Sequence, residues 1–450
     1  MVRVRIAPSP TGCLHLGNLL VGVFNMLFKL KHGARLILRL EDTDTARSFG
    51  DCAPKVYDAF NMVGLVFDES PLDCGKFGPY IQTQRRHIYS CYCKLLVASG
   101  SAFWCKCRWQ RTNALKRVNL ALGQASVYDG RCLKSQVRGS YGCLKLRLKV
   151  PRAGVFASSE CAVAWKQVEM QPLWVRGEAV FHLASVVDDH LMRVSHVLRG
   201  RDWLASFAKH SLLYVYLVFS VPKVIHLPLL ALGGGTKLSK RLVAGGVSAY
   251  SNLGVVPEAI LTYLACLAVG EQVASLEDAV QRFNLQCCRR QSVRVDHKRL
   301  FGINRRLLAS ASITCFSLFG LALGKHKVNK ALALCVEKAS LLADVYRLMS
   351  FAFCSSFDLV AWGSRSSSYA VLAVLVREHK RLAVWTKPAL MALHTKISAK
   401  LGMSLRSVLV LMYVVAFGTR DSISLYDSFV ILGKDAVVFR LSLSLNQLST

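Results

Sequence analysis

Two segments of this 450-residue chain carry residue types suited to binding a polyphosphate. The first, residues 5–18, places prolines and glycines around a turn, followed by His15 where a helix is expected to begin. Glycines let a ligand approach the backbone closely, and a histidine at the positive end of a helix can donate to phosphate oxygens. The second, residues 236–241, carries Lys237 and Lys240, which can stabilise charge that develops on a phosphate. Together the segments predict a nucleoside triphosphate site.

Each segment also has an ordinary structural interpretation. Residues 5–18 contain neither Gly-x-x-x-x-Gly-Lys-Ser/Thr nor Gly-x-Gly-x-x-Gly, so the common nucleotide motifs are not satisfied. A plain strand, turn and helix with a partly buried His15 is the alternative there. Residues 236–241 could be a solvated basic turn, as expected in so positive a chain. The glycine triplet at 233–235 favours the ligand-binding interpretation because it supplies a hinge.

The elements around the first segment predict a parallel sheet. Residues 2–7 alternate as in a strand, and apolar residues from Leu16 onward recur at helical spacing. Residues 35–40 are typical of a second strand, which ends at the acidic segment 41–44. A strand–helix–strand unit implies parallel strands, and ligands of such sheets bind at the carboxyl ends of the strands. Residues 7–12 and 41–44 both lie at those ends.

The rest of the chain divides into an α/β part and a helical part. Further elements of the α/β part are expected at residues 53–70 (helix), 80–99 (helix), 184–189 (a strand ending in two carboxylates), 197–219 (strand, then helix) and 226–232 (strand). Residues 100–172 change in composition and predict an insertion with its own fold. Helical patterns dominate from about residue 255 to the end, with a loop expected at 364–368.

Composition excludes a disordered chain and indicates a polyanionic partner. The hydrophobic content of 53% is ample for sizeable cores, and the net charge of +31 favours nucleic acid as a partner over a mere compositional bias. The 16 cysteines and the lack of a secretory apolar segment predict reduced thiols and a cytoplasmic location. No stretch reaches the roughly 20 apolar residues of a spanning helix, so no membrane partner is expected.

The two polyphosphate segments resemble the HIGH and KMSKS motifs of class I aminoacyl-tRNA synthetases. Segments that are similar to the glutamyl-tRNA synthetases in particular are residues 5–12, 40–44, 78–80, 186–192, 237–241, 257–259 and 402–406. The resemblance is dense up to about residue 270 and thin after 310. It implies an α/β Rossmann-like catalytic domain with an inserted α+β acceptor-binding domain, followed by an all-α C-terminal domain. The implied boundaries are 1–99 and 173–240 for the catalytic domain, 100–172 for the acceptor-stem-binding insertion, 241–305 for a junction that contacts the tRNA stem, and 306–450 for the helical anticodon-binding domain.

The resemblance also implies roles for single residues. Catalysis is implied for His15, Lys237 and Lys240, and ATP binding for His15, Gly17, Asn18, Lys237, Ser239 and Lys240. Glutamate binding is implied for Arg5, Ala7, Ser9, Glu41, Phe181, Ser185 and Arg199. The two arginines agree with elementary chemistry, because guanidinium forks suit carboxylates. Phe181 stands where the family usually has Tyr and Ser185 where Asn is common, which predicts weaker glutamate binding.

The implied reaction is ATP-dependent ligation of L-glutamate to tRNA(Glu) through a glutamyl-adenylate, with ATP as its Mg²⁺ complex, by a monomer. Charging of tRNA(Gln) as well, or a catalytically decayed basic RNA-binding protein, are the alternatives. A glutaminyl enzyme is disfavoured because residues 8–11 read Pro-Ser-Pro-Thr and not Pro-Glu-Pro-Asn. The related enzyme that modifies a tRNA base lacks an anticodon domain, which disfavours it for a chain of 450 residues.

A cysteine group in the expected insertion resembles the zinc site of some family members. Cys105 and Cys107 are followed by Cys132, but Lys134 stands where the family has a histidine ligand. Tyr128 could substitute as the fourth ligand. Structural zinc normally takes four tetrahedral ligands, and cysteine is abundant in this chain, so a bound zinc ion is possible but not favoured.

Three other groups receive structural or RNA-binding interpretations. The run from Asp188 to His190 is expected to fix local turns and hydrogen bonds, with no metal or chemistry assigned. Trp362 and Trp385 could stack on anticodon bases, but burial in a helical core is favoured for each. Basic residues expected to contact tRNA phosphates, with a solvated helix face as the alternative, are Arg289, Arg290, Arg294, Lys298, Arg299, Arg305 and Arg306.

Overall fold

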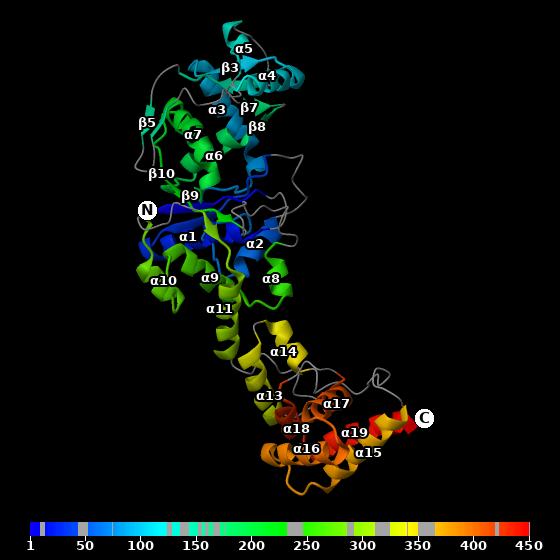
Figure 1. The fold of residues 1–450 in the computed structure, drawn as a ribbon. Helices are drawn as coiled ribbons and strands as arrows, with labels where there is room; N and C mark the ends of the chain where they lie inside the picture. The colour runs from blue at the N-terminus through cyan, green and yellow to red at the C-terminus, as the bar shows by residue number, and fades with distance from the viewer. Residues whose placement is uncertain are drawn as a thin grey trace. The chain divides into compact units, whose positions relative to one another are not determined.

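A computed structural model shows two units in the chain (Figure 1). The first comprises residues 1–250 and 260–296, and the second comprises residues 251–259 and 297–450. The structure describes residues 1–9, 14–43, 53–73, 75–123, 128–135, 144–151, 155–157, 162–164, 172–175, 177–231, 246–285, 292–310, 325–339, 341–349, 365–418 and 423–449.

The first unit begins with the expected strand–helix–strand motif. Strand β1 (Arg3–Ile6) pairs in parallel with β2 (Arg35–Leu38), and helix α1 (Leu16–His32) connects them. The apolar residues of α1 are buried at helical spacing, and Gly33 ends the helix at a φ of 58°, a conformation that glycine adopts without strain. The predicted parallel unit is therefore confirmed, and the carboxyl ends of β1 and β2 lie at one edge of the sheet.

A second parallel pair lies beside the first. Strand β9 (His196–Gly200) pairs with β10 (Lys223–Leu227), and helix α7 (Leu204–Tyr216) lies between them in sequence after the short 3-10 helix η3 (Arg201–Trp203). The Ser195 amide donates to the carbonyl oxygen of Arg3 at 3.0 Å, which holds β9 next to β1. Both pairs therefore present their carboxyl ends to the same region.

The strand expected at residues 226–232 is wrong in its extent. The structure has two strands there, β10 ending at Leu227 and β11 (Leu230–Ala231). Pro228 separates them because proline has no amide hydrogen to donate to a sheet. Strand β11 pairs in parallel with β12 (Val293–Arg294), a strand within a region expected to be helical.

The strand expected at residues 184–189 is wrong, because this segment lies within helix α6 (Phe181–Leu191). Leu183 and Val187 are completely buried in a core that also takes side chains from α3 (Arg86–Ala98) and α7. Short apolar runs do not distinguish a buried strand from a buried helix. Because α6 is buried on most sides, its sequence lacks the polar stripe that would have identified an amphipathic helix.

Three other expected elements differ from the structure. Helix α2 (Ala53–Asn61) ends well before residue 70, and Gly64 follows at a φ of 77°, which a continuing helix does not allow. The loop expected at 364–368 is wrong, since α15 (Arg365–Arg381) already begins at residue 365. Serines are as common at the start of a helix as in a loop, so the serine run did not decide between them. The helix expected at 80–99 is observed as the 3-10 turn η1 (Gln82–Arg85) followed by α3.

An antiparallel sheet of four strands lies in the same unit, in the order β3 (Ala102–Cys105), β4 (Lys145–Leu148), β7 (Pro172–Val175) and β8 (Glu178–Ala179). Its inner face buries Trp104, Leu146 and Trp174 against α3 and α6. Helices α4 (Trp109–Ala121) and α5 (Arg131–Lys134) and the hairpin β5 (Val155–Ala157) and β6 (Ala162–Ala164) complete this part. Figure 1 shows the sheet and α4 together.

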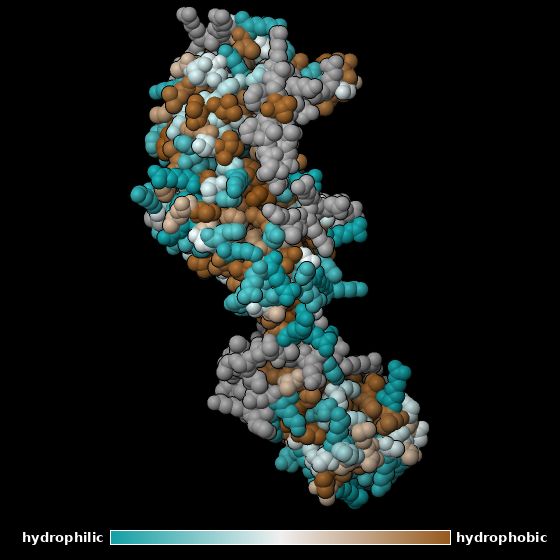
Figure 2. Space-filling view, turned by 90° about the vertical axis from the view of Figure 1, so that its left-hand side faces the viewer, coloured by the Kyte–Doolittle hydropathy of each residue, from teal (hydrophilic) through white to brown (hydrophobic). Residues whose placement is uncertain are grey.

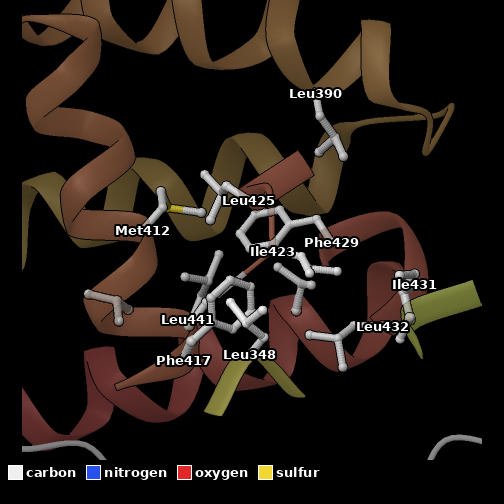
Figure 3. Close-up of a cluster of buried hydrophobic side chains, with 14 of the residues drawn as sticks. Leu348, Leu390, Met412, Phe417, Ile423, Leu425, Phe429, Ile431, Leu432 and Leu441 are labelled. Atoms are coloured by element: carbon white, nitrogen blue, oxygen red, sulfur yellow. The ribbon is translucent and has the colours of Figure 1, made fainter. Parts of the chain in front are cut away.

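Helices follow the α/β part in sequence, as expected. They are α8 (Ser248–Asn252), α9 (Pro257–Val269), α10 (Leu276–Arg282), α11 (His297–Ser310), α13 (Lys325–Lys338), α14 (Leu342–Met349), α15, α16 (Lys387–Leu401), α17 (Leu405–Phe417), α18 (Leu425–Leu432) and α19 (Lys434–Ser449). Figure 3 shows the core of the second unit, where Phe417 and Phe429 pack edge to face with Leu425 and Leu441 around them.

Trp385 belongs to this core. Its ring stacks on Phe429 with centroids 6.2 Å apart, and its Nε1 donates to the Phe429 carbonyl oxygen at 2.8 Å. Trp385 is half-buried and packs against the core, so the favoured interpretation of burial is confirmed in part. Trp362 lies outside the described residues.

No described helix is by itself long and apolar enough to span a membrane. Among the described helices, only the pair α16 and α17, bent by 111° at their junction, has the length and composition of a span when taken together. On the face drawn in Figure 2, hydrophilic and hydrophobic side chains are interspersed in both units.

A pair of histidines is buried in the core of the second unit. His379 on α15 and His394 on α16 place their Nε2 atoms 3.0 Å apart, and His379 Nδ1 donates to the Leu375 carbonyl oxygen at 2.8 Å. Burial lowers the pKa of His379 to about 4, and burial together with His379 lowers the pKa of His394 to about 3. Both rings are therefore neutral near pH 7, and the aromatic rings of Tyr426 and Phe429 cover them.

This pair predicts acid sensitivity of the second unit. The unfolded chain takes up protons at an ordinary pKa of about 6.5, whereas the folded rings do not, so stability is lost as the pH falls from about 6.5 toward about 4. At pH 5 the loss is about 2 kcal/mol per histidine. Urea unfolding at pH 7.5 and 5, followed by circular dichroism, should give a smaller acid loss for His394→Leu than for His87→Leu, whose histidine is exposed. Equal losses in the two variants would contradict the prediction.

Candidate functional site

A pocket of about 310 Å³ lies at the carboxyl ends of β1 and β9. It brings together the segment after β1, the beginning of α1 and the residues that follow β9 and β10. Its lining residues are Arg5, Ile6, Ala7, Pro8, Ser9, His15, Gly17, Asn18, Val21, Phe60, Gly200, Asp202, Trp203, Pro228, Leu229 and Leu230. Six residues expected to bind ATP or glutamate are in this set. The location is the one that a parallel sheet offers to ligands.

His15 and Gly17 shape the part of the pocket at the beginning of α1. His15 Nδ1 accepts from the Gly17 amide at 3.1 Å, and the Asn18 side-chain oxygen accepts from the His15 amide at 3.2 Å. A Cβ atom at Gly17 would lie 2.9 Å from the His15 ring, so only glycine permits this arrangement. Because Nδ1 accepts, a neutral His15 carries its proton on Nε2. The positive end of a 17-residue helix is also at this position.

A buried ionic cluster lies behind the pocket. Asp189 on α6 accepts from Arg5 Nε at 3.2 Å and from Arg39 Nη1 at 2.7 Å. Arg39, which is 0% exposed, also donates to Glu41 at 2.9 Å and to Ser185 Oγ at 3.4 Å. Burial raises the pKa of Asp189, but the coulombic attraction of Arg5 and Arg39 outweighs it and leaves that pKa below its usual value. Burial raises the pKa of Glu41 despite the same two cations.

Asp188 extends this cluster toward α3. Its carboxylate accepts from Arg85 Nε at 2.7 Å, from Gln82 Nε2 at 3.0 Å and from the Tyr89 hydroxyl at 2.8 Å. Asp188 is 0% exposed, so each of these partners compensates for lost hydration. The expected role in hydrogen bonding is thus observed for Asp188 and Asp189, although within a helix. His190 instead stacks on Phe219 with ring centroids 3.6 Å apart.

Among the described residues, no carboxylate lies within hydrogen-bond distance of Arg199. Its Nη1 lies 3.1 Å from His210 Nδ1 and its Nε donates to His226 Nε2 at 3.3 Å, while the buried Nη2 has no hydrogen-bond partner in the described part of the chain. Burial and the nearby Arg5 lower the pKa of Arg199 to about 10. In the cluster, Arg5, Arg39 and Arg85 are matched by three carboxyl groups, so Arg199 is the surplus positive charge. Such a site favours an anionic ligand.

The other expected glutamate-binding residues lie around the same region. Phe181 packs on Trp203, which lines the pocket, with ring centroids 4.4 Å apart. Ser185 contacts Arg39, as described above. Lys237, Ser239 and Lys240 lie outside the described residues.

Sequence reasoning missed several residues of the site. Arg39 and Arg85 organise the cluster, and His210 contacts Arg199, yet none was singled out. Arg39 lies in an apolar strand segment and His210 in an apolar helix, and this placement of a charged or polar residue was the available signal. Trp203 lines the pocket but belongs to a 3-10 turn with no motif to indicate it.

The cysteine group is assembled around Tyr128. The Sγ atoms of Cys105, Cys107 and Cys132 all lie within 4.8 Å of one another, and the Tyr128 hydroxyl lies 3.5 Å from Cys105 Sγ and 3.3 Å from Cys107 Sγ. Burial raises the pKa of Cys132, but hydrogen bonds from Tyr128 and the Lys106 backbone contribute to a net pKa of about 7. Tetrahedral zinc with Zn–S bonds of about 2.3 Å separates its sulfurs by roughly 3.8 Å. The observed donor set fits that geometry.

Most of the basic residues expected to contact RNA are exposed where the structure describes them. On α11, Lys298, Arg305 and Arg306 are exposed, whereas Leu300 and Ile303 are buried. Arg294 on β12 is also exposed and Arg299 is half-buried. Arg289 and Arg290 lie outside the described residues.

A parallel α/β fold with a pocket built from the HIGH-like segment defines a class I aminoacyl-tRNA synthetase catalytic domain, and comparison with known families agrees. Residues 1–302 match the family model "tRNA synthetases class I (E and Q), catalytic domain", and residues 309–445 match "Anticodon binding domain". The chain belongs to this family of class I tRNA synthetases.

Relatives of known name cover almost the whole chain. A glutamate--tRNA ligase of Rhizobium meliloti is 33% identical over 470 residues, which covers 98% of this chain and 96% of the relative. A glutamate--tRNA ligase of Agrobacterium fabrum is 32% identical, covering 100% of this chain and 98% of the relative. A crystal structure of a glutamate tRNA ligase from Elizabethkingia meningosepticum shares the fold at a TM-score of 0.79, with 24% identity and 99% of each chain covered.

The buried cluster predicts a large stability loss when Asp188 is changed to Asn. An amide cannot offset the Arg85 charge, and leaving a buried charge uncompensated costs about 3–5 kcal/mol. The control is Arg282→Gln, which removes an exposed ion pair with Asp278 in the same unit and should change stability little. Urea unfolding of both variants checks the prediction. A loss for Asp188→Asn no greater than that of the control would contradict it.

Proposed function

We propose that this protein ligates L-glutamate to tRNA(Glu) in an ATP-dependent reaction that passes through glutamyl-adenylate. The observation that carries the proposal is the buried Arg199, a surplus cation beside the pocket. The same pocket is lined by the HIGH-like segment at the beginning of α1. L-Glutamate carries two carboxylates and one ammonium, so its net charge of −1 complements that surplus. The glutamate--tRNA ligases that cover the whole chain support the same substrate.

The first step joins glutamate to AMP. The α-carboxylate oxygen of glutamate attacks the α-phosphorus of ATP, the bond to the bridging oxygen breaks, and pyrophosphate leaves. His15, with its proton on Nε2, would donate to phosphate oxygens, and the amides at the beginning of α1 with Gly17 and Asn18 would face the nucleotide. In the second step a terminal ribose hydroxyl of tRNA attacks the glutamyl carbonyl carbon and AMP leaves.

Little acid–base chemistry is needed, so positioning and charge stabilisation dominate. Holding both reactants in line contributes about 7–11 kcal/mol to lowering the barrier. Mg²⁺ bound to ATP, as part of the substrate, offsets phosphate charge. Lys237 and Lys240, with Ser239 between them, would stabilise the charge that develops on the leaving pyrophosphate.

The glutamate-binding roles are proposed from position. Arg5 and Arg199 would bind carboxylate, and Glu41 would accept the ammonium. Ala7 and Ser9 line the pocket after β1. Phe181 lacks the hydroxyl of the usual tyrosine and Ser185 is shorter than the usual asparagine, so glutamate affinity is expected to be lower than where both are present.

The domains are proposed with the boundaries given by the sequence. Residues 1–99 and 173–240 would form the Rossmann-like catalytic domain, and 100–172 the acceptor-stem-binding insertion, whose four-stranded sheet takes its last strands from residues 172–179. Residues 241–305 would be the stem-contacting junction and 306–450 the anticodon-binding domain.

The tRNA would be held largely through its phosphates. Exposed Lys298, Arg305 and Arg306 on α11 support this, as does the net charge of +31. We propose a monomer, as the resemblance to the family implies. A cytoplasmic location is supported by the described cysteines, which are free thiols.

The direct test is aminoacylation. Pure protein with ATP, Mg²⁺ and labelled glutamate should charge tRNA(Glu). A parallel reaction with tRNA(Gln) determines whether the enzyme is non-discriminating. Charging of neither tRNA, with intact folding by circular dichroism, would overturn the proposal and favour a decayed RNA-binding protein.

Lys240→Ala should lower the rate of adenylate formation far more than it changes glutamate affinity. The reason is that the lysine would act on charge that develops only in the transition state. Pyrophosphate exchange in the presence of tRNA measures the rate, and the glutamate dependence of that exchange gives KM. The matched control is Lys223→Ala, an exposed lysine on β10. Equal exchange rates in Lys240→Ala and the control would refute the role.

We also propose that Cys105, Cys107, Cys132 and Tyr128 hold a structural zinc ion. Lys134 had counted against zinc because it replaces a histidine ligand. The convergence of three thiols on the Tyr128 hydroxyl is an independent observation in favour of a metal, because it completes a four-donor set without residue 134. The ion would link β3 to α5 and take no part in the reaction.

Metal analysis checks this proposal. Protein purified without added chelator should contain about one zinc ion per chain, as measured by inductively coupled plasma mass spectrometry. Cys132→Ser should lose the zinc ion because the three remaining donors bind it weakly. The matched control is Cys93→Ser, a buried thiol outside the group. Absence of zinc in the parent protein, or unchanged zinc in Cys132→Ser, would contradict the proposal.

A further inference from the structure

Two imidazoles in contact, the buried His210 and the half-buried His182, lie next to Arg199. His210 on α7 has its Nδ1 atom 3.1 Å from Arg199 Nη1, and its Nε2 atom lies 3.0 Å from His182 Nδ1 on α6. On the other side, Lys209 Nζ lies 3.3 Å from His182 Nε2. The two histidines therefore lie between two cationic side chains.

Both rings are held in the neutral state. Burial lowers the pKa of His210 far below its ordinary value, and the charge of Arg199 lowers it further. Burial and the charge of Lys209 lower the pKa of His182 to about 3. Arg199 is a donor only, so His210 must accept at Nδ1 and carry its single proton on Nε2, which faces His182. Protonated Lys209 also only donates, so the neutral His182 ring can accept from His210 or from Lys209 but not from both. The bond from Arg199 therefore fixes the tautomer of His210.

The partners of Arg199 differ in charge from those of its neighbours. Arg5 and Arg39 are bound by carboxylates, which offset much of their charge. His210 and His226 accept hydrogen bonds from Arg199 without adding a negative charge. The guanidinium is therefore oriented without a directly bound carboxylate, and its Nη2 atom has no hydrogen-bond partner among the residues that the structure describes.

We propose that His210 is a positioning residue that holds Arg199 through an uncharged acceptor, so that the guanidinium keeps its full charge for the side-chain carboxylate of an acidic substrate. This inference rests on the proposed function of the same site. The proton of His210 stays on Nε2 because Arg199 only donates and Nδ1 must accept from it. An acidic residue at position 210 would hold Arg199 equally well but would compete with the substrate for its charge.

Three substitutions at one position separate hydrogen bonding from charge. His210→Leu removes the acceptor, His210→Asn keeps an uncharged acceptor, and His210→Asp supplies a charged one. The matched control is His190→Leu, a histidine of α6 that stacks on Phe219 and not on the arginine. For each protein, KM for glutamate, KM for ATP and kcat are measured in tRNA charging, and folding is checked by circular dichroism.

We expect His210→Leu and His210→Asp to raise the KM for glutamate about tenfold to hundredfold, the range of a hydrogen bond to a charged group. The KM for ATP should stay within about threefold, and His210→Asn and His190→Leu should remain near the parent protein in both constants. An unchanged KM for glutamate in His210→Leu would overturn the inference. So would equal rises in the KM values for glutamate and ATP, or equal behaviour of His210→Asp and His210→Asn.

The outcome is separable from that of the proposed function. If the parent protein does not charge tRNA(Glu), the proposed function fails. In that case glutamate binding by calorimetry, with tRNA present, replaces KM as the readout for the same variants. If the parent protein charges tRNA(Glu) and the His210 variants follow the control, the positioning role alone fails.

Discussion

The bridge from Asp189 to Arg5 and Arg39 is the interaction on which the architecture of the site depends. Arg5 lies on β1, Arg39 directly follows β2, and Asp189 lies on α6, so one carboxylate joins three elements that are distant in sequence. All three side chains are buried, and buried charges are tolerated only when they are paired. A shift of β1, of the segment after β2 or of α6 would leave a charge without compensation. This pairing of buried charges therefore fixes the positions of the elements that form the pocket.

The two sides of the site suit two different kinds of anionic group. At one side, the beginning of α1 with His15 offers backbone amides and a ring proton, which suit phosphate oxygens. At the other, Arg199 offers a guanidinium that no carboxylate of the described residues binds directly, although Asp189 and Glu41 act on it at longer range, and such a group suits an acidic side chain. Glycine at position 17 is required at the phosphate side because the His15 ring occupies the space of a Cβ atom. A ligase that joins an acid to a nucleotide needs both sides at one pocket.

The motifs and the periodicity of apolar residues predicted the strands and the helix around the pocket better than they predicted the buried elements and ion pairs behind it. The helix after residue 15, the parallel pairing of β1 with β2 and the location at their carboxyl ends followed from spacing, glycines and strand–helix–strand order. The strand assigned to residues 184–189 failed because α6 is buried on most sides and has no polar stripe. Arg39 was missed because it follows an apolar strand as an apparent interruption, and Arg85 because it lies in a polar run that gives no sign of its burial. Trp385, in the short linker between α15 and α16, packs against the core through its ring and its Nε1 hydrogen bond.

The sequence alone determined the class of fold. It also predicted the candidate ligand-binding residues and the negative charge of their ligands, because each of these depends on residue type and on short spacing along the chain. Only the tertiary structure decided which cation is left without a carboxylate, which histidines hold it and which thiols meet at Tyr128. Those outcomes depend on distances of a few ångströms between residues far apart in the chain. Pairing of buried charges is a property of three-dimensional neighbours, and no local pattern of residues records it.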